Sequence, residues 1–314
     1  MYHPYFRGKQ YDLITVRELA PLLSKADFRP IIEPVRESLS SLQKALDAVV
    51  ALGGSAIVIV NPYHGDLSGT AQSLTDLLKN EFDNPGVSAG ILLREDMNLR
   101  QIMSCLETHK DHTAVFIHAG FTEPKALSEK LGPLSNENCH IFVDRLCGKL
   151  YQRHFKGAER VLLRDGFVRR KRNSDYPRLE FFSDLHATYS DEGMDGFGDF
   201  LIVGDDYSES GGPAYAVAIH LTFIDPDQDD AMYIYHFISK RQSTPTDPAG
   251  KFAEALDEMM RVLDSPKSKV LETDAVKEFR MLHEQGHFPG LGYLKKLSMS
   301  HHIETLADYF NKSH

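Results

Sequence analysis

Short apolar runs rich in β-branched residues recur along the first two hundred residues, about 25–30 residues apart as far as the seventh run. Most are continuously apolar, which is typical of strands buried on both faces of a parallel sheet. The segments between them place apolar residues three or four positions apart, as amphipathic helices do. The eight runs are Tyr2–Arg7, Arg29–Val35, Ala56–Asn61, Ala89–Glu95, Ala114–Ala119, His140–Leu146, Arg160–Asp165 and Phe200–Asp205.

Regular alternation of buried strands and helices indicates parallel strands joined by right-handed crossovers. Eight repeats fit an α/β fold of the (β/α)8 TIM-barrel type, which is typically about 250 residues long. An open doubly wound sheet is the alternative, but it usually carries a glycine fingerprint after its first strand. Gly8 follows the first run here without any G-x-G-x-x-G spacing. We therefore predict a barrel.

Two departures from the period predict additions to this barrel. The connection between the seventh and eighth runs is much longer than the usual 2–6 residues, and such connections are often functional. Beyond the eighth run, two strand-like segments flank an acidic turn and predict an antiparallel hairpin. We expect the barrel to cover residues 1–264, including the long loop 165–199, the hairpin 214–239 and an eighth helix at Lys251–Leu263. A helical extension over residues 265–314 is expected to pack on the barrel, with helices at Thr273–Glu284 and His301–Phe310.

Composition limits the class of protein. The chain has 314 residues and a formal net charge of −10, which argues against a protein that coats DNA non-specifically through a broad cationic face. Its three cysteines form no CxxC pair, so we expect a reducing compartment and no structural zinc. The N-terminus lacks the apolar stretch of a signal peptide, and no apolar run reaches the roughly 18 residues of a membrane span. The expectation is a soluble cytoplasmic protein.

Ionisable residues follow most of the predicted strands. In a barrel of this type the active site lies at the C-terminal ends of the strands. Burying charges there is costly unless they are paired, so their recurrence predicts a polar pocket. The alternative is a ring of internal salt bridges. The residues at these ends are Arg7, Lys9, Glu33, Asn61, His64, Arg94, Glu95, His118, Asp144, Arg145, Arg164, Asp165, Asp205 and Asp206.

The residue types at these ends predict a site for a phosphate-bearing substrate. Carboxylates suit a hard cation, so Glu33, Asp165 and Asp205 are candidate ligands for Mg²⁺. Guanidinium and ammonium groups hold phosphate. The candidate anion-binding residues at the strand ends are Arg7, Lys9, Arg94 and Arg164.

The long loop contains four consecutive basic residues, Arg169–Arg172, in an otherwise acidic chain. A solvated surface loop is the simpler interpretation, but the run begins just past a predicted strand end. Arg170, Arg172, Asn173 and Tyr176 are therefore candidate anion-binding residues. For proton transfer the candidates are Asp165, His186, Asp175 and Glu33, with Asp184 or Asp175 orienting His186.

Two further histidines lie on the predicted hairpin. A turn centred at Gln228 sets His220 opposite His236, and cross-strand neighbours can come within reach of one metal ion. Packing in a half-buried sheet is the commoner role of such histidines. The sequence leaves both interpretations open.

Several blocks of the chain resemble the phage beta-protein group of bacterial proteins. The opening Tyr2-x-Pro4-Tyr5-x-Arg7-Gly8-Lys9-Gln10 with Arg17-Glu18-Leu19 is similar to the start of that group. The segments Arg172-Asn173-x-Asp175-Tyr176-Pro177 and Phe182-Ser183-Asp184-Leu185-His186 resemble its central signature, and Gly196-Phe197-Gly198-Asp199-Phe200, Ile219-His220-Leu221 and His236-Phe237 resemble its later blocks. The resemblance implies a barrel-like protein of bacterial defence or mobile-element gene neighbourhoods with a restriction-endonuclease-like protein as neighbour. It assigns no catalytic residue.

Three functions are consistent with these features. The first is an enzyme, such as a metal-dependent phosphodiesterase or nuclease, that acts on a nucleotide or nucleic acid at the barrel rim. The second is a non-catalytic sensor or regulatory subunit that binds a nuclease partner or a phage ligand, with Tyr233, Tyr235 and Phe237 as an aromatic docking surface. The third is a glycosidase using Glu95 and Asp165, which the absence of Trp disfavours.

Overall fold

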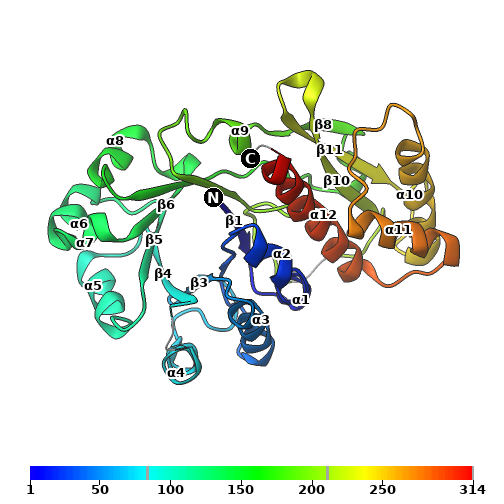
Figure 1. The fold of residues 1–314 in the computed structure, drawn as a ribbon. Coiled ribbons are helices and arrows are strands. Elements are labelled where there is room, and N and C mark those ends of the chain that lie inside the picture. Colours follow the sequence, from blue (N-terminus) through cyan, green and yellow to red (C-terminus); the bar gives the residue numbers. More distant parts are fainter. Residues whose placement is uncertain (83–84, 210–211, 313–314) are drawn as a thin grey trace. The chain divides into compact units, whose positions relative to one another are not determined.

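The computed structural model describes residues 1–82, 85–209 and 212–312 (Figure 1). The chain forms two compact units. The barrel unit comprises Met1–Arg164 and Thr188–Phe200, and the sheet unit comprises Asp165–Ala187 and the described part of Leu201–His314. The predicted boundary lies at residue 264, whereas in this division the first part of the long loop, residues 165–187, and the hairpin belong to the sheet unit and residues 188–199 of the loop belong to the barrel unit.

The barrel unit contains a closed barrel of eight parallel strands, which confirms the predicted fold class. β9 closes it by pairing with both β7 and β1, with Phe197 in register with Tyr2. Side chains such as Tyr5, Ile57 and Ile141 fill the interior. The strands in barrel order are β1 (Tyr2–Phe6), β2 (Ile31–Ile32), β3 (Ala56–Ile59), β4 (Val87–Arg94), β5 (Ala114–Ala119), β6 (Cys139–Val143), β7 (Glu159–Leu163) and β9 (Gly196–Asp199).

The predicted position of the eighth strand was wrong. Phe200–Asp205 lies beyond β9 and contains a turn with Leu201 in the left-handed region at φ 54°. The strand that closes the barrel instead begins with glycine. A Cβ atom on Gly196 would lie 2.7 Å from the Met1 carbonyl oxygen, and one on Gly198 would lie 2.4 Å from the His3 carbonyl oxygen. Close approach of two backbones therefore replaces the β-branched signature of the other strands.

Helices follow the strands of the barrel, and Figure 1 shows α3 to α6 lying outside β3 to β6. The first two helices, α1 and α2, follow each other directly, and Pro21 occupies the first turn of the second. The helices of this unit are α1 (Gln10–Glu18), α2 (Ala20–Lys25), α3 (Ser40–Ala51), α4 (Gln72–Glu81), α5 (Leu99–Thr108), α6 (Pro124–Leu131), α7 (Leu134–Glu137) and α8 (Lys149–Gln152), with 3-10 turns at η1 (Asp144–Leu146) and η2 (Arg153–Phe155).

The sheet unit is built on three antiparallel strands in the order β10–β11–β8. β10 (Ala218–Asp225) and β11 (Ala231–Ile238) are the predicted hairpin, and β8 (Leu179–Ser183) comes from the predicted long loop. The remaining elements are α9 (Leu185–Thr188), which ends at the unit boundary, α10 (Pro248–Leu263), α11 (Asp274–Gln285), α12 (Leu291–Lys312), η3 (Asn173–Asp175) and η4 (Pro226–Gln228).

The predicted eighth barrel helix is α10 of the sheet unit. Its apolar residues Phe252, Leu256 and Met259 are buried in one core with Ile219 and Phe237 of the hairpin. An amphipathic helix buries its apolar stripe against any suitable sheet, so its sequence could not identify which sheet that is. None of the helices in the described ranges is long and apolar enough to cross a membrane.

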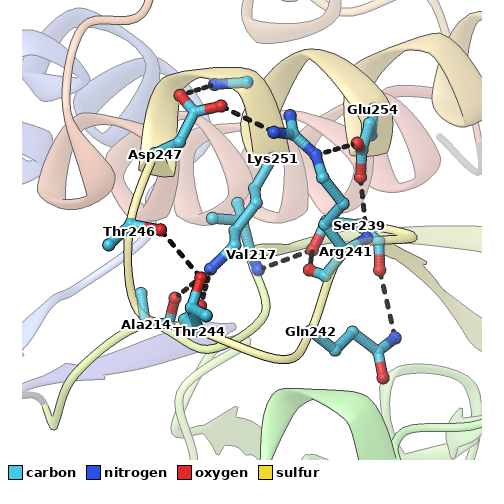
Figure 2. A network of polar contacts seen from close by, with 11 residues as sticks. Ala214, Val217, Ser239, Arg241, Gln242, Thr244, Thr246, Asp247, Lys251 and Glu254 are labelled. Atoms are coloured by element: carbon cyan, nitrogen blue, oxygen red, sulfur yellow. Dashed lines mark hydrogen bonds and ion pairs between the residues drawn. The ribbon is translucent and has the colours of Figure 1, made fainter.

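A polar network fixes the start of α10 (Figure 2). The Arg241 guanidinium donates to Asp247 at 2.7 Å and to Glu254 at 2.5 Å, while Asp247 accepts from the backbone N–H of Gly250 at 2.9 Å. The Lys251 ammonium is buried and donates to the carbonyl oxygens of Ala214 and Thr244. The bond from Asp247 caps a backbone N–H group in the first turn of α10, and the other bonds hold the loop that leads into the helix.

Candidate functional site

A buried carboxylate lies at the C-terminal end of β2 in the barrel unit. The Glu33 side chain is 0% exposed and is surrounded by donors. Tyr5 Oη donates at 2.9 Å, and the backbone N–H groups of Tyr63 and His64 donate at 2.9 and 3.1 Å. The Arg7 guanidinium forms an ion pair with the same carboxylate. Residues that follow three neighbouring strands therefore meet on Glu33.

This surrounding determines the protonation state of Glu33. Burial alone would raise the pKa of its carboxyl group. The hydrogen bond from His64, the charge of Arg7 and the backbone donors outweigh burial and lower that pKa to about 2. Glu33 is therefore ionised at neutral pH, and both of its oxygens accept hydrogen bonds.

The Glu33 carboxylate orients the imidazole ring of His64. Nδ1 of His64 lies 3.1 Å from Oε1 and 3.3 Å from Oε2 of Glu33. An ionised carboxylate can only accept, so we infer that Nδ1 carries the proton and that Nε2 is the acceptor nitrogen. Gly65 lets this loop pack closely, because it has φ 73° and a Cβ atom there would lie 2.1 Å from the Val35 carbonyl oxygen. The side chain of His64 is 24% exposed.

Two arginines and a tyrosine complete this part of the rim. The Arg7 guanidinium lies over the rings of Tyr5 and Phe200, 4.9 and 5.7 Å from their centroids. The Arg94 guanidinium lies 4.5 Å from the ring centroid of Tyr63, which is itself half exposed. Arg94 also makes two hydrogen bonds of 2.9 Å to the exposed carboxylate of Asp96.

Other candidates at the strand ends have structural partners. The Arg164 guanidinium bridges Asp144 at 2.6 Å and Glu192 at 3.0 Å. Lys9 is the N-cap residue of α1, and its backbone N–H donates to Asp12 at 3.3 Å. The contacts of Arg164 favour the internal salt bridges that the sequence left open.

Two polar side chains from the predicted rim belong to the packing of the barrel. Asn61 hydrogen-bonds to the backbone N–H and carbonyl of Leu92 on β4. His118 is buried, with Nδ1 2.7 Å from Tyr151 Oη and Nε2 2.8 Å from His140 Nδ1. Burial lowers the pKa of His118 well below its usual value, so this pair of rings is neutral.

In the sheet unit, Asp165 and Asp205 hold a turn. The Asp165 carboxylate accepts from the backbone N–H groups of Phe167 at 2.9 Å and of Asp205 at 2.8 Å. Gly204 has φ 72° and a Cβ atom there would lie 3.2 Å from Asp165 Oδ2. This arrangement gives Asp165 a structural task, and its catalytic role stays a prediction from the sequence.

Three more candidates of the long loop make local contacts. Asp175 pairs with the exposed side chain of Arg172 at 3.3 Å. Nδ2 of Asn173 donates to the Ala216 carbonyl at 2.9 Å. His186 is buried, and its Nε2 donates to the Asp230 carbonyl at 2.9 Å. Because that nitrogen is engaged with a backbone carbonyl, His186 fastens the loop to the hairpin turn.

Arg170 and Tyr176 take part in a partly buried polar cluster that could not be predicted from the sequence. Arg170 donates to Glu180 on β8, and Glu180 contacts His236 on β11. The Tyr176 ring stacks on that of His236 with centroids 4.7 Å apart. In the sequence, Glu180 is one acidic residue of the predicted long loop. Its position on a strand becomes evident only from the pairing of β8 with β11.

The predicted magnesium ligands do not form a cluster. Among the described residues, no group of three or more His, Cys, Asp or Glu side chains is arranged to hold a metal ion. Glu33 has both oxygens engaged by donors, and Asp165 has both engaged by backbone amides.

Comparisons with known proteins found no relative of this chain. No family model, no curated protein and no solved structure matches the chain. The resemblance to the phage beta-protein group stays a prediction from the sequence blocks.

Proposed function

We propose that the protein binds or cleaves a phosphate-bearing substrate, a nucleotide or a nucleic acid, at the C-terminal rim of its barrel unit, with His64 as the proton-transfer residue. The observation that carries this proposal is the fixed orientation of His64 by Glu33. A fully buried, ionised carboxylate is costly to desolvate, and it is placed at the end of the barrel where active sites of this fold are built.

The roles of the residues follow from their contacts. Nε2 of His64 takes a proton from a water molecule as the water oxygen bonds to phosphorus. The bond from phosphorus to the ester oxygen breaks, and His64 returns the proton to that leaving oxygen. Glu33 positions the ring and stabilises the imidazolium, as the carboxylate does in a catalytic triad. Arg7 supplies positive charge beside the His64 ring, and Arg94 supplies it over the neighbouring ring of Tyr63.

The test is turnover and binding of a panel of substrates by the full chain. The panel contains a phosphomonoester, a phosphodiester, a nucleoside triphosphate and a short single-stranded RNA. His64→Gln should reduce turnover of any accepted substrate by about 100-fold or more, because general acid–base catalysis contributes about that much. His154→Gln is the matched control, since His154 is an exposed histidine of the same unit. Equal rates in both variants would remove His64 from the mechanism.

A second candidate is the non-catalytic sensor or regulatory subunit. The observation that favours it is charge pairing, because Arg94, Arg164, Arg170 and Arg172 all contact carboxylates, and an anion would have to compete with these. Of the aromatic docking residues expected for a nuclease partner, Phe237 is fully buried and Tyr235 packs against the core, whereas Tyr233 lies beside the exposed Phe181. Binding to a restriction-endonuclease-like partner that is lost in Phe181→Ser, with no turnover of the panel, would support this candidate.

A further inference from the structure

The side chain of Tyr63 is an exposed aromatic ring beside the histidine of the barrel rim. Tyr63 is 52% exposed, and its ring centroid lies 4.9 Å from that of His64 with the two ring planes at 71°. Within the described residues its hydroxyl group makes no hydrogen bond. Exposed rings are common on protein surfaces. What distinguishes Tyr63 is the set of contacts that hold it in place.

The position of Tyr63 is fixed from two sides. Its backbone N–H donates to Glu33 at 2.9 Å, so the residue is anchored to the carboxylate that orients His64. The Arg94 guanidinium lies over one face of the ring, 4.5 Å from the centroid. Two hydrogen bonds of 2.9 Å to Asp96 hold that guanidinium. A ring that is ordered before a ligand arrives loses little conformational entropy on binding.

The rest of the Tyr63 ring is open to solvent. An exposed fraction of 52% leaves roughly 100 Å² of this residue accessible, which is more than a hydroxyl group alone exposes. Because Arg94 covers one face, the accessible area includes ring carbons away from the guanidinium. A flat aromatic surface of this kind stacks with nucleobases, and it accepts any base because every base has a π-face.

Groups suited to a phosphate lie on either side of the Tyr63 and His64 pair. The Arg7 guanidinium approaches the His64 ring, with Nη1 3.3 Å from Nδ1, and the Arg94 guanidinium lies over Tyr63. A nucleotide joins a flat base to a phosphate through a single sugar, so it can contact both rings at once. A sugar phosphate without a base would leave the Tyr63 ring unused.

We infer that Tyr63 is the base-stacking residue of the rim site, and that the substrate class of this site is a nucleotide or single-stranded nucleic acid with an unpaired base next to the phosphate at His64. The inference rests on the proposed function for the place of the phosphate, whereas stacking is a binding event that needs no turnover. In a duplex the bases stack on one another, and taking one out of the stack costs free energy. The site therefore favours single strands.

Fluorescence titration of a single-stranded tetranucleotide that contains 2-aminopurine tests the stacking, because the emission of this base falls when it stacks. The chain has no Trp whose emission would interfere. We expect the full chain to quench the probe, Tyr63→Leu to bind it about tenfold more weakly or worse, and Tyr63→Phe to bind it normally. Tyr215→Leu is the matched control and should also bind normally, since Tyr215 is a 49% exposed tyrosine of the sheet unit.

An abasic tetranucleotide with the same sugars and phosphates is the matched ligand. It should bind more weakly than the base-bearing probe, and Tyr63→Leu should not weaken it further. The probe annealed to its complement should compete poorly with the single strand. Equal affinity of Tyr63→Leu and the unsubstituted chain for the base-bearing probe, or an equal loss for both ligands, would overturn the inference.

Two outcomes separate this inference from the proposed function. Binding that depends on Tyr63, without turnover of any substrate in the panel, would support the stacking and contradict proton transfer by His64. Turnover with the same KM for a base-bearing substrate in Tyr63→Leu and Tyr215→Leu would support the proposed function and overturn the stacking. Unchanged 2-aminopurine emission with the unsubstituted chain at millimolar concentration would also overturn it, and this measurement requires no variant.

Discussion

Nδ1 of His64 lies 3.1 Å from Oε1 of Glu33, and this contact joins the loop after β3 to the end of β2. Glu33 also accepts from Tyr5 and Arg7 of the neighbouring β1 segment. One buried carboxylate therefore ties together three consecutive strand ends and fixes an imidazole ring at the rim. The same contact has consequences for both stability and chemistry.

Glu33→Gln should destabilise the barrel unit by about 3–5 kcal/mol, because it removes the buried charge that compensates the largely buried Arg7 guanidinium. Urea denaturation followed by a probe in the barrel unit measures this change. Glu37→Gln is the control, since Glu37 is exposed just after the same strand. A loss of less than about 1 kcal/mol would show that the charge of Glu33 is not needed for folding.

The stability of the barrel unit should depend on the ionisation of Glu33 in acid. Its pKa is lowered from 4.5 to about 2 in the fold, so its contribution is fully present above about pH 4.5 and is lost as pH falls towards 2. The lowering corresponds to about 3 kcal/mol at neutral pH. The difference in unfolding free energy between the unsubstituted chain and Glu33→Gln should shrink across this window. A constant difference would contradict the assignment.

The sheet unit should respond to acid over a different range. The pKa of His220 is lowered by burial from 6.5 to about 3, so the neutral ring contributes stability that is present above about pH 6.5 and is lost as pH falls towards 3. His220→Gln should flatten the pH dependence of unfolding of the sheet unit between these values. Hydrogen exchange of β10 and β11 amides at several pH values follows this unit separately, and an unchanged slope in the variant would argue against burial of a neutral His220.

Gly198→Ala should open the barrel at its closing strand. The added Cβ atom would lie 2.4 Å from the His3 carbonyl oxygen, a backbone atom that cannot move aside without shifting β1. We expect a loss of about 3 kcal/mol or more in unfolding free energy. Gly148→Ala has no atom within 4 Å of its new Cβ and should be nearly neutral. Similar melting temperatures for the two variants would mean that β9 does not close the barrel in this register.

Asp247→Ala should loosen the start of α10 by about 1–2 kcal/mol, since it removes both the N-cap bond to Gly250 and the pairing with Arg241. Asp247→Asn keeps a capping oxygen and tolerates the left-handed backbone at φ 52°, so it should lose less. Thermal unfolding of the two variants measures the difference. If both lose the same amount, the pairing with Arg241 matters and the cap does not.

The barrel could be predicted because its strands are buried on both faces and repeat with a nearly constant period. β9 was not recognised as a strand, because close backbone contact there requires glycine where the other strands have apolar, β-branched residues. The opposition of His220 and His236 was also predicted and is confirmed by their register. The arginine partners could not be predicted, since Arg164 meets Glu192 and Arg170 meets Glu180 only after the chain has folded. Glu33 was predicted as a base or a metal ligand, and its contacts with Arg7 and His64, on which the proposed positioning role rests, likewise form only in the folded chain.

The most direct measurement of the central claim is the protonation of the His64 ring in the full chain at neutral pH. Histidine nitrogen spectra should show the proton on Nδ1 and the lone pair on Nε2, and Glu33→Gln should change the populations of the two tautomers. If the free protein carries the proton on Nε2, or if Glu33→Gln leaves the His64 resonances unchanged, then Glu33 does not orient His64 and the rim is not a proton-transfer site.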